Sequence, residues 1–295
     1  MNTYFCAANV QEMNQTPFDE LVFRLTARYG AEEAASIARI AIEDLFYTKA
    51  ARHWRISDDS DRQRFDDLCE RLEAGEPVQY VTGQADFFGL VFHVSPAVLI
   101  PRQETEELVD WVLEWLRGYA GVSPRVLDIG TGSGCIGIAL RHQRPDIILT
   151  ATDKSKEALE QARENAFRLL PSAGSCTFAV EDILHPSPGF LESRWEVIVS
   201  NPPYIPVREK AMMPEHVLAH EPALALFVDD ADPLLFYRVI ADLALEKLMS
   251  GGGLFFECNE FNATEVAGLL EQKGFRDVQL RRDMAGADRM VKGVV

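Results

Sequence analysis

The stretch RVLDIGTGSG, residues 125–134, decides the fold of this chain. Residues 125–129 form an apolar run with the length of a buried strand, and a glycine-rich turn follows it directly. The apolar spacing after the turn predicts a helix over 135–143. Glycine lets the backbone approach a ligand closely, and the first N–H groups of a helix bind a carboxylate or a phosphate. We therefore expect a cofactor to bind at the turn, whose residues are Gly130, Thr131, Gly132, Ser133 and Gly134.

Strands and helices alternate from this stretch to the end of the chain. The predicted strands are 125–129, 147–152, 176–180, 195–200, 253–257, 277–282 and 289–294. The predicted helices are 135–143, 155–169, 233–249 and 262–273. This alternation indicates a Rossmann-like, doubly wound α/β sheet. No helix separates the last two strands, so we expect the last strand to be antiparallel.

The chain divides into four regions. We expect a flexible leader over 1–15, a small helical domain over 16–76, a β-hairpin linker over 77–103 and the α/β domain over 104–295. Three apolar stripes at helical spacing support the helical domain: Phe18, Leu21, Val22 and Leu25; Ile37, Ile40, Ala41 and Leu45; Phe65, Leu68, Cys69 and Leu72.

The composition of the chain limits the classes of molecule that it can be expected to bind. The 295 residues carry a formal net charge of −17, which argues against an electrostatic grip on nucleic acid and favours a protein partner. No apolar stretch has the length of a membrane span. The five cysteines show no C-x-x-C pairing, which fits a reducing, cytoplasmic compartment. His216 and His220 lack a third ligand nearby, so we expect no metal site. We expect the chain to work as a monomer.

Two cofactors compete for the glycine turn. Gly132-x-Gly134-x-x-Gly137 matches the dinucleotide fingerprint, and Asp153 ends the next predicted strand, where a carboxylate can bind both hydroxyls of a ribose. Asp128, directly before the turn, instead resembles the acid in the Asp-x-Gly-x-Gly-x-Gly motif of S-adenosylmethionine-dependent enzymes. In that motif the acid orients the turn and helps to hold the amino-acid end of the ligand. This resemblance favours S-adenosylmethionine over NAD.

Two residues after the third predicted strand could contact an adenine ring. Asp182 could accept a hydrogen bond from the exocyclic amine, and Ile183 could cover the ring. Asp182 would fit equally well as the N-cap of a helix.

The turn Asn201-Pro202-Pro203-Tyr204 follows the fourth predicted strand. Neither proline has an N–H to donate, so the strand cannot continue and the turn is rigid. The Asn201 side-chain oxygen and the Pro202 carbonyl could accept both protons of a planar NH2 group, while Tyr204 packs on its face. This turn resembles the substrate clamp of methyltransferases that act on amide or exocyclic amino nitrogens.

The chain as a whole resembles the glutamine-N5 methyltransferases that modify peptide chain release factors (the HemK/PrmC-like family). The matching segments, in order, are Gly75-x-Pro77-x-x-Tyr80-x-x-Gly83-x-x-x-Phe87, Ile100-Pro101-Arg102-x-Glu104-Thr105-Glu106, the glycine turn, Asn201-Pro202-Pro203-Tyr204 and Glu221-Pro222-x-x-Ala225-Leu226. The resemblance implies a class I S-adenosylmethionine-dependent fold and transfer of a methyl group to the glutamine of a Gly-Gly-Gln loop. It also implies that the N-terminal helices dock the release factor. Glu257-Cys258-Asn259-Glu260 departs from the family's usual Glu-Ile-Gly after the fifth strand.

The resemblance leaves three alternatives. An amino-methyltransferase on adenine or guanine of nucleic acid shares the clamp, although the acidic composition counts against it. Ribosomal-protein glutamine methyltransferases also carry Asn-Pro-Pro-Tyr, although Glu-Thr-Glu after Pro-Arg is normally absent from them. A catalytically silent module could use the same fold to dock a partner.

Further residues could belong to the substrate site. Arg102 and Glu104 could line the pocket, or they could be scaffold at the start of a helix. Phe87 could shape the entrance for the glutamine side chain or fill the core. Residues 205–232 could form a lid or a solvated loop.

Overall fold

The computed structural model describes residues 16–172 and 174–295, so the expected leader over 1–15 lies outside the described residues. The chain divides into two compact units between Gln84 and Ala85. Each unit has its own core. Within the described residues, no helix combines the length and the apolar character that a membrane span requires.

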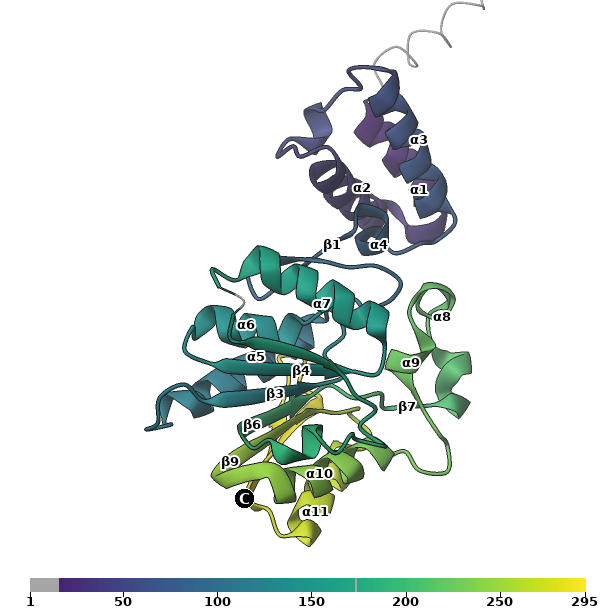
Figure 1. The fold of residues 1–295 in the computed structure, drawn as a ribbon. Coiled ribbons are helices and arrows are strands. Elements are labelled where there is room, and N and C mark those ends of the chain that lie inside the picture. The colour runs from purple at the N-terminus through teal and green to yellow at the C-terminus, as the bar shows by residue number, and fades with distance from the viewer. Residues whose placement is uncertain (1–15, 173) are drawn as a thin grey trace, which may run out of the picture. The chain divides into compact units, whose positions relative to one another are not determined.

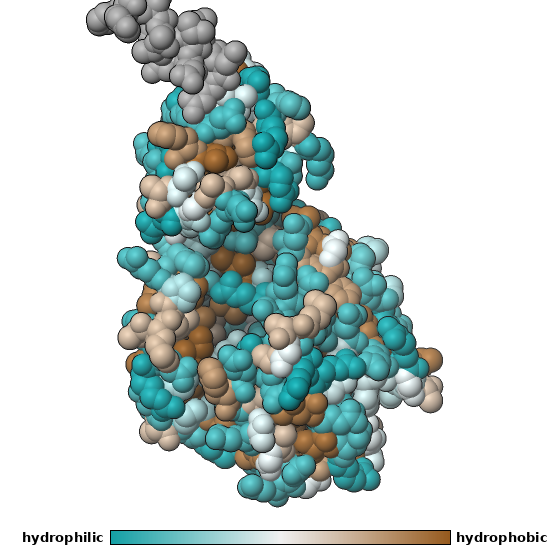
Figure 2. All heavy atoms as spheres, turned by 180° about the vertical axis from the view of Figure 1, so that it is seen from behind, coloured by the Kyte–Doolittle hydropathy of each residue, from teal (hydrophilic) through white to brown (hydrophobic). Residues whose placement is uncertain are grey.

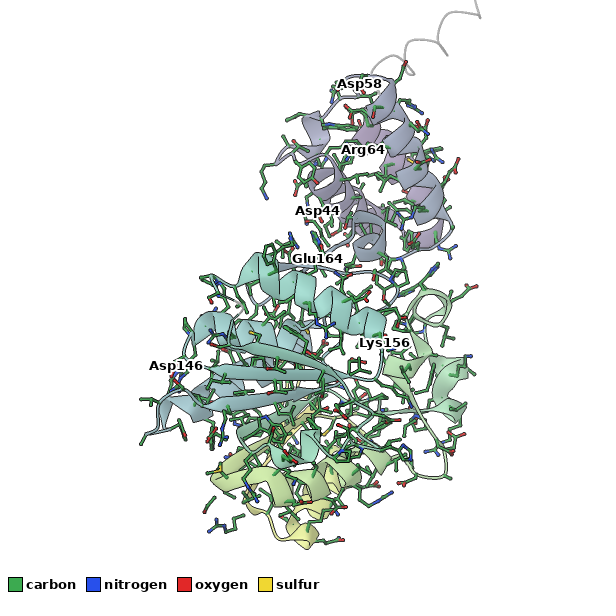
Figure 3. The ribbon with its side chains drawn as sticks, in the orientation of Figure 1. Asp44, Asp58, Arg64, Asp146, Lys156 and Glu164 are labelled. Atoms are coloured by element: carbon green, nitrogen blue, oxygen red, sulfur yellow. The ribbon has the colours of Figure 1, made fainter. Side chains whose placement is uncertain are left out.

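The N-terminal unit is a helical bundle. Its helices are α1 (Pro17–Tyr29), α2 (Ala31–Leu45), α3 (Asp59–Glu73) and the short α4 (Val78–Thr82), with a 3-10 turn, η2 (Ala51–His53), before α3. Thr16 and Asp19 form a capping box at the start of α1. Asp58, labelled in Figure 3, caps α3 by accepting a hydrogen bond from the backbone of Asp61.

The predicted apolar stripes of α1 and α3 face the core of the bundle, whereas the stripe predicted for α2 is only partly right: Ala41 is buried, but Ile37, Ile40 and Leu45 are only partly buried. The buried face of α2 carries Ala34, Ala38, Ala41 and Ile42, whereas the predicted isoleucines and Leu45 lie at its margin. Small alanines at the centre of the face let α2 approach α1 closely. Hydropathy alone selects the larger side chains and so rotates the prediction away from the true contact face.

The region predicted as a linker is divided between the two units. Residues 78–82 form helix α4 and belong to the helical unit, so the hairpin begins later than expected. The strands β1 (Gln84–Phe87) and β2 (Leu90–His93) pair with each other. Their side chains Phe87 and Phe92 are buried in the core of the second unit. Apolar burial therefore joins the hairpin to the α/β unit.

The second unit contains a seven-stranded sheet (Figure 1), which confirms the predicted doubly wound fold. Its strands are β3 (Arg125–Ile129), β4 (Ile148–Asp153), β5 (Cys176–Val180), β6 (Trp195–Ser200), β9 (Leu248–Glu257), β10 (Arg276–Arg282) and β11 (Asp288–Val294). Their order in the sheet is β10-β11-β9-β6-β3-β4-β5. The last strand, β11, is antiparallel to both of its neighbours, as predicted.

Helices cover both faces of this sheet (Figure 1). One face packs against α5 (Gln103–Arg117), α6 (Cys135–Gln143) and α7 (Lys156–Leu169). The other packs against α10 (Leu235–Lys247) and α11 (Ala263–Lys273). The central strands β3 and β6 are almost wholly buried between these layers, as expected for parallel strands. The face of the molecule in Figure 2 is largely hydrophilic, in keeping with the high charge of the chain.

Strand register places one row of residues along the carboxyl edge of the sheet. Ile129 pairs with Thr152 on one side and with Ser200 on the other, and Ser200 pairs with Phe256. The next residue of each strand or loop is Gly130, Asp153, Asn201 or Glu257. Across the edge their order is Glu257, Asn201, Gly130 and Asp153. The strand order reverses at this point, and open α/β sheets bind ligands there.

Residues 205–232 fold over this edge, and the alternative of a solvated loop is wrong. The segment holds the two-stranded parallel pair β7 (Ile205–Pro206) and β8 (Phe227–Val228), the 3-10 helix η4 (Val207–Met212) and the short helices α8 (Glu215–His220) and α9 (Ala223–Leu226). Val217, Glu221 and Leu226 are buried. His216 and His220 lie on α8, and the described residues contain no group of three His, Cys, Asp or Glu side chains that could hold a metal ion.

Candidate functional site

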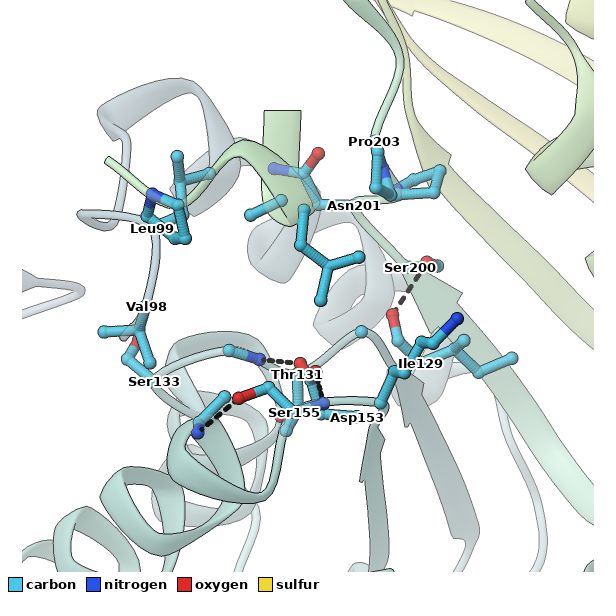
Figure 4. A pocket seen from close by; sticks show the side chains of 18 of the residues that line it. Val98, Leu99, Ile129, Thr131, Ser133, Asp153, Ser155, Ser200, Asn201 and Pro203 are labelled. Carbon is cyan, nitrogen blue, oxygen red and sulfur yellow. Dashed lines mark hydrogen bonds between the residues drawn. The ribbon is translucent and has the colours of Figure 1, made fainter. Parts of the chain in front are cut away.

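A cavity of about 360 Å³ opens at the carboxyl edge of the sheet. Its walls come from the loops that follow β3, β4, β5 and β6, together with residues near the start of α5 and in the 205–232 segment. In Figure 4, Asn201 lies across the cavity from Thr131, Ser155 and Asp153. The loop segments that line it are 130–133, 153–155, 181–184 and 200–203.

Asp128 holds the glycine turn from behind the cavity wall. Its Oδ2 atom accepts hydrogen bonds from the Thr131 hydroxyl at 2.6 Å and from the backbone N–H of Gly137 at 3.0 Å. The side chain is fully buried, and this burial raises its pKa to about 6. Its other oxygen, Oδ1, has no hydrogen-bond partner among the described residues. Asp128 thus orients the turn; its predicted contact with the amino-acid end of a ligand stays a prediction.

Gly134 is the glycine of the turn that tolerates a side chain least. Its φ is +84°, and an added Cβ would lie 2.6 Å from Ile138 Cδ1. We expect Gly134→Ala to lower the free energy of unfolding by roughly 2–4 kcal/mol, from left-handed backbone strain and overpacking together. Gly132 is the matched control, because its φ is +55° but an added Cβ meets no atom within 4 Å. Gly132→Ala should cost only the strain, about 1–2 kcal/mol in urea unfolding without cofactor. Equal losses in the two variants would contradict this explanation.

Asp153 joins the glycine turn to the start of α7. Its Oδ2 accepts the N–H of Gly132, and its Oδ1 accepts the N–H of Ser155, each at 2.9 Å. Burial raises the pKa of this carboxyl group, against the effect of the backbone hydrogen bonds. The carboxylate lines the cavity and keeps further lone pairs for a ligand hydroxyl.

Asp182 and Ile183 line the same cavity beyond β5. Asp182 is not a helix N-cap, so that alternative is wrong: its Oδ1 accepts the N–H of Leu184 at 3.1 Å in a tight turn. Lys154 lies 2.8 Å from its other oxygen, and that contact holds the pKa of Asp182 below its usual value. Ile183 presents an apolar wall beside this ion pair. A polar edge next to an apolar surface suits a heteroaromatic ring.

Asn201 stands where the main cavity meets a second one. The second cavity has a volume of about 150 Å³ and shares Leu99, Arg102, Asn201 and Ala225 with the first. Tyr204 lines only the second cavity, whereas Pro202 and Pro203 line only the first. The rigid turn therefore presents its amide at the junction.

Buried polar groups hold the Asn-Pro-Pro-Tyr turn from behind. Asn201 Nδ2 donates a hydrogen bond to the Thr105 hydroxyl oxygen at 3.3 Å. The Thr105 hydroxyl donates to Glu257 Oε2 at 2.6 Å, and the Tyr204 hydroxyl donates to Glu257 Oε1 at 3.5 Å. Both the asparagine and the tyrosine of the turn are thus linked to a single carboxylate.

Arg102 lines both cavities and joins two distant segments. Its Nη2 lies 2.6 Å from Glu221 Oε1, and the Glu221 side chain is only 1% exposed. Glu221 Oε2 also accepts the N–H of Ile100 at 3.4 Å. This buried carboxylate therefore fastens the 205–232 segment to the loop before α5. Arg102 is at once part of the cavity wall and part of the scaffold, the two alternatives that the sequence left open.

We expect Arg102→Gln to loosen the 205–232 segment. The substitution leaves Glu221 as a buried charge without its cation. Breaking a fully buried ion pair typically costs about 3–5 kcal/mol, and we expect less here because the Arg102 side chain is 36% exposed. Amide hydrogen exchange should accelerate at residues 214–228 and stay unchanged in β3 and β4. The control Arg208→Gln removes an exposed arginine that contacts Asp230 inside the same segment. If both variants exchange like wild type, the ion pair does not hold the segment.

Two predicted substrate residues lie away from both cavities. Glu104 is exposed in the first turn of α5, where an acid complements the helix dipole, and it lines neither cavity. Phe87 is 1% exposed and packs edge-on against Phe92 with ring centroids 6.0 Å apart. The core alternative therefore holds for Phe87, and its assignment to the substrate entrance is wrong.

Sequence reasoning missed Thr105, Glu257 and Lys154 as parts of the site. A signal existed for the first two. Thr105 lies inside the Arg102-x-Glu104-Thr105-Glu106 segment, and Glu257 ends a predicted strand at the edge that carries Asn201. An acid at the carboxyl end of a buried parallel strand is a site candidate by position alone. Lys154 carried no such signal.

Comparison with known proteins places this arrangement in a family. Residues 112–224 match the family model "Methyltransferase small domain", and residues 18–83 match the "PrmC N-terminal domain". The release factor glutamine methyltransferase of Flavobacterium psychrophilum is 43% identical over 75% of this chain and 76% of its own length. That of Bacteroides thetaiotaomicron is 43% identical over 78% of this chain and 80% of its own length. The chain belongs to the release factor glutamine methyltransferase family.

The fold of this family member also occurs in more distant proteins. The catalytic domain of hMettl16, solved in complex with MAT2A 3'UTR hairpin 1, has a TM-score of 0.57 and 15% identity over 88% of this chain and 90% of that chain. At this identity the likeness concerns the fold alone. The fold is that of the class I S-adenosylmethionine-dependent methyltransferases, as predicted.

The cofactor is S-adenosylmethionine, and the cavity suits it. Gly130 and Gly132 line the cavity, and an added Cβ at either position would meet no atom within 4 Å, so the turn leaves open space there. Asp153 offers a carboxylate to a ribose, and Ile183 offers an apolar surface to an adenine. The orphan Oδ1 of Asp128 supplies negative potential beneath the turn. The contacts of these individual residues with the cofactor stay predictions.

Proposed function

We propose that this protein transfers a methyl group from S-adenosylmethionine to the side-chain amide nitrogen of the glutamine in the Gly-Gly-Gln motif of peptide chain release factors. One observation carries the proposal. Asn201 stands at the junction of two cavities, one of which suits the cofactor. The other has a volume of about 150 Å³, enough for a side chain. Family membership supports the same substrate.

The mechanism we propose depends on alignment. An amide nitrogen is a poor nucleophile because its lone pair is delocalised into the carbonyl. Bound S-adenosylmethionine supplies an electrophilic methyl group on a sulfonium. Asn201 Oδ1 and the Pro202 carbonyl accept the two N–H protons of the substrate amide and so fix its nitrogen in line with that methyl group. The bound cofactor would supply the methyl group for a new C–N bond as its C–S bond breaks and would leave as S-adenosylhomocysteine, and the nitrogen would pass one proton to water. No side-chain base is needed.

The second cavity supplies the walls for the glutamine side chain. Its apolar residues include Leu99, Ile205, Val217 and Leu226. Tyr204 adds an aromatic face whose hydroxyl is held by Glu257. An apolar slot with one amide at its end selects a side chain with a short aliphatic stem and a terminal amide.

The docking of the release factor completes the proposal. We assign this role to the helical unit, which matches the PrmC N-terminal domain and exposes Phe23 and Tyr47. The net charge of −17 favours a protein substrate over a nucleic acid. The cysteines of the described residues are free, which is consistent with a cytoplasmic enzyme. We propose that it acts there as a monomer.

Parallel methyl-transfer reactions on different substrates test the substrate class. Purified protein with labelled S-adenosylmethionine is given release factor, its Gly-Gly-Ala variant, ribosomal protein, and total RNA and DNA in parallel. The proposal expects label in the wild-type release factor only. Label in RNA or DNA, with none in release factor, would move the function to the amino-methyltransferase alternative. Equal label in the Gly-Gly-Ala variant would contradict the assignment of the glutamine.

A further inference from the structure

We propose that Glu257, acting through Thr105, is the positioning group that fixes which end of the Asn201 amide faces the substrate. This inference rests on the proposed function. It concerns two residues, Glu257 and Thr105, to which neither cofactor binding nor the Asn-Pro-Pro-Tyr clamp assigns a role. Glu257 is the last residue of β9, and Thr105 lies in the first turn of α5.

The three side chains form a directed chain of hydrogen bonds. Glu257 and Thr105 are each 2% exposed. Glu257 lines neither cavity, so it acts from behind the wall, whereas Thr105 lines the main cavity beside Asn201. The distances are 2.6 Å from the Thr105 hydroxyl to Glu257 Oε2 and 3.3 Å from Asn201 Nδ2 to the Thr105 hydroxyl. The first is a short, charge-assisted hydrogen bond.

The number of protons on each group decides which side chain donates in each of these hydrogen bonds. An ionised carboxylate can only accept hydrogen bonds, and a hydroxyl has a single proton to donate. The Thr105 proton is committed to Glu257, so Thr105 can only accept from Asn201. Asn201 must then turn its NH2 group toward Thr105 and its oxygen away from it. This is the orientation in which Oδ1 can accept a proton from the substrate amide.

The same carboxylate also makes a long, weak hydrogen bond to the other end of the turn. Tyr204 donates its hydroxyl to Glu257 Oε1, at 3.5 Å. The Asn201 amide, through Thr105, and the Tyr204 ring are thus both linked to Glu257 at the end of β9. The rest of the clamp needs no separate support, because Pro202 and Pro203 fix the backbone between them.

The environment of Glu257 makes this chain sensitive to protonation. Burial raises the pKa of Glu257 to about 7, and the charge of Glu104 acts in the same direction. The hydrogen bond from Thr105, the cation of Arg289 on β11 and the nearby amide of Asn201 oppose this rise. The other titratable groups that face it are Tyr204, Tyr237, Cys135 and Cys258.

Protonation of Glu257 would allow the hydrogen bonds among Glu257, Thr105 and Asn201 to reverse. A neutral carboxyl group has a proton of its own to donate to Thr105. The Thr105 proton could then turn to Asn201, which favours the reversed amide with Oδ1 toward Thr105. The working orientation is therefore enforced while Glu257 is ionised, above its pKa, and weakens as the pH falls through about 7. The rate of methyl transfer should therefore fall as the pH drops below the pKa of Glu257.

Glu257→Gln tests the inference, since it keeps the size of the side chain and removes the charge. We expect its kcat at pH 8 to fall roughly 10- to 100-fold, as for other small losses of alignment. Its S-adenosylmethionine affinity, measured by calorimetry, should stay at the wild-type value. The acid limb near pH 7 in the wild-type kcat profile should be absent from the variant. A purely structural role would lower activity by the same factor at every pH.

Thr105 provides a second pair of variants, which remain informative if Glu257→Gln does not fold. Thr105→Ser keeps the hydroxyl and should retain activity, whereas the isosteric Thr105→Val should lose it as Glu257→Gln does. Equal kcat in these two variants, or a wild-type pH profile in Glu257→Gln, would overturn the inference and leave the proposed function intact. Absence of transfer by the wild-type enzyme at every pH would instead overturn the proposed function.

Discussion

Asn201→Ala should lose methyl transfer by at least ~10³-fold, because alignment of the reacting atoms can supply on the order of 7–11 kcal/mol of barrier reduction. Asn201 lines both the cofactor cavity and the smaller cavity. Its amide has no role in holding the glycine turn, which depends on Asp128 and Asp153. The affinity for S-adenosylmethionine should therefore change little.

Single-turnover transfer and calorimetry on the same preparation measure the two quantities separately. The matched control is Gln279→Ala, which removes an exposed amide from β10. It should leave both transfer and cofactor affinity unchanged. If Asn201→Ala loses cofactor affinity by as much as it loses rate, the amide binds the cofactor and the clamp hypothesis is wrong.

Asp153→Ala should have the second-largest effect, on cofactor affinity. In the proposed complex its carboxylate accepts both ribose hydroxyls, and each hydrogen bond to a charged group is worth roughly 1.5–3 kcal/mol. Losing two of them predicts a Kd for S-adenosylmethionine that rises on the order of 10²- to 10⁴-fold. The substitution also frees the N–H groups of Gly132 and Ser155, which loosens the turn in the same direction.

Calorimetry with Asp153→Ala and Asp153→Asn measures this effect. The asparagine keeps one acceptor and should lie between the alanine variant and wild type. The control Glu160→Gln neutralises an exposed acid on α7. It should bind like wild type. An unchanged Kd in Asp153→Ala would show that the ribose lies elsewhere.

The sequence predicts the α/β fold well because the central strands β3, β4 and β6 are short, largely apolar runs with a polar or glycine residue at their ends. The predicted strand at 195–200 and its turn at Asn201 match the structure. The face of α2 was predicted only in part, because three of its four buried residues are alanines and hydropathy favours isoleucine. Hydropathy measures the preference for burial, whereas contact between helices depends on size as well.

The site was only partly predictable, because its polar groups meet across long sequence separations. Thr105 and Glu257 are 152 residues apart, and Arg102 and Glu221 are 119 apart. Each of these pairs depends on the register of the sheet and on the path of the 205–232 segment. Local patterns report neither. Residues next to a strand end, such as Asp153 and Asn201, are predictable because the strand itself carries them to the edge.

Tandem mass spectrometry of the modified release factor tests the central claim most directly. Release factor is incubated with the enzyme and S-adenosylmethionine, digested, and sequenced across its Gly-Gly-Gln motif, with Asn201→Ala enzyme as the control. We predict one added methyl group on the glutamine side chain, formed by the wild-type enzyme and absent with the variant. A methyl group on any other residue, or an equal yield from Asn201→Ala, would contradict the proposed clamp and its substrate.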